Sequence, residues 1–195
     1  MKAKKLQNKT RSSLASPKYS DCYANLSNNR MIFISEDITK DVASSLSALL
    51  FHYDNENDEE EISIYINTNG GDAYAQANIY DIMQLIKSPI RTICIGKAYS
   101  AGAFILAAGT KGKRFITKNS SVMIHGLQCE FPRAHEDQRN SQIYFDFLKN
   151  LDKIVFAQLA KDTGKTYDQV YEDCKKDKYM TAEETLEYGI VDHIL

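Results

Sequence analysis

The spacing of apolar residues changes along the chain, and the change predicts alternating strands and helices. Short apolar runs at residues 31–34, 62–66 and 91–95 have the length of strands. In the intervals between them, apolar residues recur at helical spacing: Ile38, Val42, Leu46, Leu49 and Leu50, then Ile79, Ile82, Met83 and Ile86. This order is the βαβ pattern, so we predict an α/β fold with a parallel sheet and right-handed crossovers.

The second half of the chain continues the same alternation. Small and apolar residues at 101–108 predict a short helix, and two further strands follow at 114–117 and 122–125. A long amphipathic stretch at about 134–161 predicts the longest helix of the chain. Two short helices and a strand at 190–191 complete the predicted elements.

Composition places this fold in a single domain. The chain has 195 residues, of which 43% are hydrophobic, and this is enough for one sizeable core. Residues 1–29 show no apolar period, so we predict a flexible basic arm there and one domain over residues 30–195.

Charge, cysteine usage and hydropathy narrow the location and the partners. The formal net charge of −2 indicates neither a nucleic acid nor an acidic membrane surface as partner. No apolar run reaches the length of a membrane span, and the first twenty residues lack the core of a secretory signal. The four cysteines form no C-x-x-C pair, so no metal site is expected. We expect a cytoplasmic protein, with an organelle stroma or matrix as the alternative.

Two candidate catalytic residues follow predicted strands. Ser100 lies between the strand that ends at Ile95 and a helix of small residues, with Ala98 and Gly102 on either side. This resembles a nucleophile elbow, although a serine in this position can equally be a helix cap. His125 ends an apolar strand, where it faces either the core or the crevice at the strand ends. A serine nucleophile needs such a base, because its hydroxyl is barely ionised at neutral pH.

A pair of glycines and an unassigned acid complete the possible site. Gly70 and Gly71 follow the strand at 62–66, where uncovered backbone N–H groups can bind an oxyanion or simply form a turn. The base also needs an orienting acid. Physical reasoning alone leaves four candidates after the long helix: Asp168, Asp173, Asp177 and Asp192.

Several segments together resemble the proteolytic subunit of Clp protease. They include Gly-Lys-Ala-Tyr-Ser-Ala-Gly-Ala around Ser100 and Asn-Ser-Ser-Val-Met-Ile-His ending at His125. The matching segments span residues 65–71, 79–84, 92–104, 107–115, 119–125, 180–184 and 188–192. They occur in the family's order and with nearly its spacing, and the resemblance covers roughly residues 30–195.

The resemblance implies a role for each candidate residue. Ser100 matches the family's nucleophile and His125 its general base, and Asp173 is expected to be the acid of the triad. The backbone N–H groups of Gly71 and Ala101 match the oxyanion hole. The implied reaction is serine endopeptidase cleavage of unfolded proteins into short peptides, with no metal or cofactor bound by this chain.

The resemblance also implies an architecture and partners. The fold is expected to be the ClpP/crotonase superfold, repeated βαβ units with a long protruding handle helix. The implied assembly is a homo-oligomeric barrel, a tetradecamer of two stacked seven-subunit rings. An AAA+ unfoldase that uses ATP is expected to feed it. The expected unfoldase-docking pocket comprises Tyr65, Ile93, Ile95, Phe115 and Leu195.

Some positions depart from the family pattern and keep other functions open. The segment after His125, residues 126–131, has one glycine where the family is glycine-rich, and Glu172 stands where an arginine is expected before the acid. Both changes bear on whether a double ring forms. The alternatives are an ATP-independent phage-type maturation peptidase, a crotonase-type acyl-CoA enzyme, and a non-catalytic ring subunit of a Clp complex.

Overall fold

The computed structural model describes residues 19–127 and 138–195. The helices are α1 (Tyr19–Ser27), α2 (Lys40–Glu56), α3 (Ala73–Leu85), α4 (Ala101–Ala107), α5 (Gln138–Thr163), α6 (Tyr167–Asp173) and α7 (Ala182–Tyr188). The strands are β1 (Met31–Ile34), β2 (Ile62–Thr68), β3 (Ile90–Tyr99), β4 (Arg114–Ile116), β5 (Ser121–Ile124), β6 (Lys178–Met180) and β7 (His193–Ile194).

The strands form one twisted sheet with the order β1-β2-β3-β4-β7. All pairings along this path are parallel, which confirms the predicted α/β class. The long strand β3 changes partner at Gly96: residues 92–94 pair with β4, and residues 97–99 pair with β5. The second half of β3 therefore runs toward the site beside a different strand.

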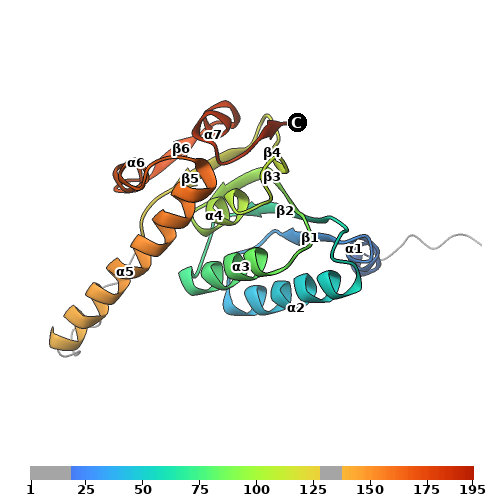
Figure 1. Ribbon diagram of the computed structural model, residues 1–195, viewed down its shortest axis with the longest axis horizontal. Coiled ribbons are helices and arrows are strands. Elements are labelled where there is room, and N and C mark those ends of the chain that lie inside the picture. Colours follow the sequence, from blue (N-terminus) through green and yellow to red (C-terminus); the bar gives the residue numbers. More distant parts are fainter. Residues whose placement is uncertain (1–18, 128–137) are drawn as a thin grey trace, which may run out of the picture.

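Helices cover one face of the sheet, and one helix extends beyond it. Figure 1 shows α2 and α3 side by side below the sheet, with α4 between the sheet and α5. The strand residues that face these helices, such as Ile34, Ile64 and Ile66, are fully or almost fully buried. Helix α5 projects away from the body in Figure 1, as expected of a handle helix. Residues 134–137 of the predicted handle lie outside the described residues.

Three elements differ from the predicted pattern because long-range contacts decide them. Residues 19–27, predicted as part of the flexible arm, form α1, and the Tyr23 ring packs edge-on against Phe33 with 5.5 Å between centroids. The predicted strand at 190–191 is wrong: residues 193–194 pair with β4 instead. Strand β6 was not predicted at all, and it pairs antiparallel with β5.

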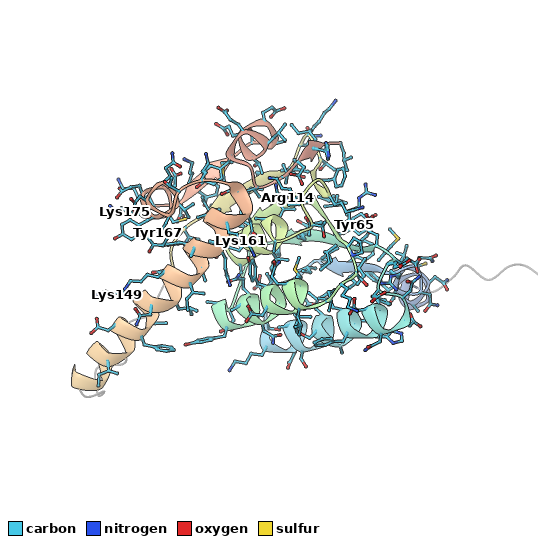
Figure 2. All side chains as sticks on the ribbon, in the orientation of Figure 1. Tyr65, Arg114, Lys149, Lys161, Tyr167 and Lys175 are labelled. Atoms are coloured by element: carbon cyan, nitrogen blue, oxygen red, sulfur yellow. The ribbon has the colours of Figure 1, made fainter. Side chains whose placement is uncertain are left out.

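A buried arginine ties the C-terminal segment to the core. Arg114 is 1% exposed and binds Asp192 through Nε at 2.9 Å and Nη2 at 2.7 Å. Its Nη1 donates to the carbonyl oxygens of Ala107 and Asp162, at the C-terminal ends of α4 and α5. Figure 2 shows Arg114 inside the body of the fold, whereas Lys149 lies on the projecting part of α5.

We expect Asp192→Asn to destabilise the fold by about 3–5 kcal/mol, because it leaves the buried Arg114 without its counter-charge. Burial opposes the charged carboxyl, but the hydrogen bonds and charge of Arg114 lower the pKa of Asp192 to about 2. The stabilisation is therefore fully present above the unfolded pKa of about 3.9 and is lost as the pH falls through about 2. Urea denaturation measures the effect.

The control is Asp58→Asn, which removes an exposed ion pair with Lys87 and should cost less than about 1 kcal/mol. Equal losses of unfolding free energy in the two variants would show that Arg114 is not held by Asp192.

Candidate active site

Ser100 occupies a strained turn between β3 and α4. Its φ of 51° and ψ of −124° lie in a region that residues other than glycine rarely adopt, at a cost of about 1–3 kcal/mol. The Oγ makes no capping bond to α4 and lies instead 2.8 Å from Nε2 of His125. Of the two roles that the sequence allowed, the helix cap is absent and the serine–histidine contact is present.

His125 reaches Ser100 because β5 lies beside the end of β3. The Ser100 N–H donates to the Met123 carbonyl at 2.8 Å, which fixes the two segments against each other. The His125 side chain is 12% exposed, so it lies in the crevice at the strand ends and not in the core. Its Nε2 can take a proton from the Ser100 hydroxyl, provided that Nδ1 carries the other proton.

The acid beside His125 is Asp177. Strand β6 pairs antiparallel with β5, and the partner of Ile124 is Lys178. The next residues on the two strands, His125 and Asp177, consequently face each other, with 3.8 Å between Nδ1 and Oδ1. The Asp177 side chain is 47% exposed. Catalytic contacts of this length in an unliganded site commonly tighten when substrate binds.

The structure does not bring Asp173 to His125, so the expectation for this residue is corrected. Its carboxylate accepts from Lys178 Nζ at 2.5 Å and from the Tyr188 hydroxyl at 3.0 Å. Burial, together with the bond to Asp173, raises the pKa of Tyr188. Through these two contacts Asp173, at the end of α6, holds this helix against β6 and α7. A structural role of this kind does not require contact with His125.

Asp177 was one of the four acids that the sequence offered as partners for His125, and nothing in the local pattern distinguished it from the other three. The signal was the strand that follows it, since an antiparallel β6 beside β5 places the preceding residue opposite His125. The residue before Asp177 is Lys176, a cation, whereas Glu172 precedes Asp173.

The glycine pair presents a backbone N–H to the site. The Ile38 N–H donates to the Gly70 carbonyl, and the Asp72 N–H donates to the Ile38 carbonyl, both at 2.8 Å. Successive N–H groups of an extended segment alternate in direction, so that of Gly71 points away from Ile38. Gly71 and Ala101, the first residue of α4, line the same cavity as Ser100. Their N–H groups have no acceptor among the described residues, so both can bind an oxyanion.

Gly70→Ala should reduce kcat by about 100-fold or more, because a Cβ there would lie 2.7 Å from Ser100 Cβ and 2.8 Å from the Tyr99 carbonyl oxygen. Displacing Ser100 by a fraction of an ångström disturbs its contact with His125. Kinetics on a fluorogenic peptide measure the loss. The control is Gly112→Ala, which has a similar positive φ of 84° but no atom within 4 Å of the added Cβ. If both variants keep full activity, Gly70 does not support the position of Ser100.

Three of the expected docking residues lie in one row across the sheet. Tyr65 pairs with Ile93, and Ile93 pairs with Phe115, so the three side chains share a face. Ile95 and Leu195 are about half exposed, whereas Ile93, in the middle of the row, is only 2% exposed. The Phe115 ring stacks on His193, and the Arg91 guanidinium lies 4.4 Å from its centroid.

No group of three or more metal-ligating side chains is found in residues 19–127 and 138–195. Over the same residues, no helix is both long and apolar enough to cross a membrane.

The strained strand-end serine, its histidine partner and the N–H groups of Gly71 and Ala101 beside them define a serine hydrolase on an α/β sheet. A model of the Clp protease family matches residues 14–195. The ATP-dependent Clp protease proteolytic subunit 1 of Prochlorococcus marinus (strain MIT 9312) is 38% identical over 175 residues, covering 90% of this chain and 88% of that protein. The chain belongs to the Clp protease family and is a serine protease of the ClpP type. This confirms the predicted family and reaction class.

Proposed function

We propose that Ser100, His125 and Asp177 form the catalytic triad of this protease, which cleaves unfolded proteins to short peptides. The observation that supports this most directly is the 2.8 Å contact between Ser100 Oγ and His125 Nε2, made by a serine that does not cap its helix. The register of β5 and β6, which sets Asp177 beside His125, supports the choice of acid.

The proposed mechanism is acyl transfer. The Ser100 oxygen attacks the peptide carbonyl while His125 takes its proton, and Asp177 holds the imidazole in the productive tautomer. The N–H groups of Gly71 and Ala101 bind the oxyanion. His125 then gives the proton to the leaving amine, and water hydrolyses the acyl-enzyme by the same steps.

We also propose that the chain assembles into seven-subunit rings that stack in pairs, with the sites inside. Apolar side chains on the projecting part of α5 support contact between subunits. Ile143 is 62% exposed and Phe147 is 52% exposed. Burying such residues against a second copy of the helix would be favourable.

An AAA+ unfoldase that uses ATP is the proposed partner, and this chain itself is proposed to bind neither metal nor cofactor. The printed name of the Prochlorococcus relative calls that protein ATP-dependent. The half-exposed Ile95 and Leu195 beside Tyr65 and Phe115 would offer the partner an apolar surface. We propose the cytoplasm as its location, where the unpaired Cys94 and Cys174 would stay reduced.

Labelling with a fluorophosphonate, followed by mass spectrometry of the modified peptide, tests the triad. We expect a single adduct at Ser100 that disappears in His125→Ala. Absence of labelling in every oligomeric state would overturn the triad and favour a non-catalytic ring subunit. Degradation of an unfolded protein that does not depend on an added unfoldase and ATP would instead favour the maturation-peptidase alternative.

A further inference from the structure

The cavity beside Ser100 combines apolar walls with negative charge. It has a volume of about 620 Å³ and lies between α3, α4, the segment after β5, and α5. Its apolar walls include Phe104, Met123, Leu127, Leu151 and Val155. Such walls suit the methylene groups of a long side chain.

Three carboxylates belong to the lining of the cavity. Asp72, Asp152 and Asp177 line it, and among the described residues of its lining there is no lysine or arginine. Asp72 caps α3 through the Ala75 N–H, and Asp177 faces His125. The carboxylate with no role in the triad or in a helix cap is therefore Asp152.

Asp152 lies half-buried on α5, and no lysine or arginine of the described lining accompanies it. Its Oδ1 accepts from the Leu127 N–H at 2.9 Å, and no described residue donates to Oδ2. Burial raises the pKa of Asp152, although the Leu127 N–H and the charge of His125 act in the opposite direction. An ammonium or guanidinium group entering the cavity would supply the missing counter-charge.

A second polar side chain of the cavity is also unsatisfied. Gln76 is 2% exposed and lines the cavity from α3, and its Nε2 has no hydrogen-bond partner among residues 19–127 and 138–195. A buried amide without a partner costs free energy, and rotation about its terminal torsion can present either the N–H or the carbonyl oxygen to an occupant. In the cavity that Asp152 also lines, the carbonyl oxygen of Gln76 would add an acceptor for a donor group.

We propose that Asp152, assisted by Gln76, makes this protease prefer substrates with lysine or arginine immediately before the cleaved bond. The inference rests on the proposed role of Ser100 as nucleophile. A peptide carbonyl held between Ser100 and the N–H groups of Gly71 and Ala101 places its own side chain in the adjoining cavity. The stem of that side chain packs on the apolar walls, and its cationic end reaches Asp152.

Two matched fluorogenic peptides test the preference, with lysine or norleucine before the cleaved bond. Norleucine keeps the chain length and lacks the ammonium group. We expect kcat/KM to be at least about 10-fold higher for the lysine peptide, because a site built for a donor rejects an analogue without it. In Asp152→Asn the ratio should fall to about 1, whereas Asp146→Asn, an exposed acid on the same helix outside the cavity lining, should keep the wild-type ratio.

A structural role of Asp152 at the Leu127 N–H would lower kcat/KM for both peptides equally and leave the ratio unchanged, which would overturn the inference. If Asp152→Asn fails to fold, the wild-type protein still decides: equal cleavage of the two peptides contradicts the proposal. Fluorescence anisotropy with the Ser100→Ala variant measures the preference without turnover. If the lysine peptide binds more tightly but the wild-type protein does not cleave it, the proposed function alone is contradicted. If the wild-type protein cleaves both peptides without preference, the inference alone is contradicted.

Discussion

Ser100→Ala is expected to remove peptidase activity almost completely, with a loss in kcat on the order of 10⁶-fold. The reason is that Ser100 Oγ is the group within hydrogen-bond distance of His125, and the serine and histidine of a triad act as a unit. Hydrolysis of a fluorogenic peptide measures the effect, with circular dichroism to show that the variant is folded. Ser44→Ala, an exposed serine on α2, is the control and should retain wild-type activity.

The same position gives a test that activity alone cannot provide. Because Ser100 has a φ of 51°, Ser100→Gly should raise the free energy of unfolding by about 1 kcal/mol while also abolishing activity. A gain in stability with a loss of function would show that the turn is strained to expose the nucleophile. A variant that is inactive and less stable than the wild type would contradict this view of the turn.

The second large effect is expected at Asp177. Asp177→Asn should lower kcat on the order of 10³-fold, because an amide beside Nδ1 no longer favours the tautomer in which Nε2 accepts a proton. Steady-state kinetics on the same peptide measure the loss. The folded state should be little affected, since the Asp177 side chain is 47% exposed.

Asp173→Asn is the matched comparison, and we expect the opposite pattern. It weakens the contacts with Lys178 and Tyr188, so it should cost about 1–3 kcal/mol of stability but reduce kcat by less than about 10-fold. Thermal unfolding and kinetics on both variants separate the two roles. A large kinetic effect at Asp173 with none at Asp177 would restore the acid expected from the sequence.

The sequence alone predicted most of the α/β framework and the positions of the chemistry. The periods of apolar residues located β1, α2, β2, α3 and β3, because these elements bury one continuous face or stripe that is visible in a local window. The family-like segments located Ser100 and His125, since each follows a strand that its own neighbours define. Local pattern could not tell a helix cap from a nucleophile, because both roles place a serine before the first helical turn.

Only the tertiary structure decided the contacts that join distant segments. The antiparallel register of β6 against β5 places Asp177, and not Asp173, beside His125, and a shift of one residue in a register changes which side chains meet. The burial of Arg114 beside Asp192 and of Gln76 beside the cavity likewise depends on elements far apart in the sequence. The sequence by itself determined most of the strands and helices and located Ser100 and His125, whereas packing between those elements placed Asp177 beside His125 and brought Gly71, Ala101 and Asp152 to one cavity.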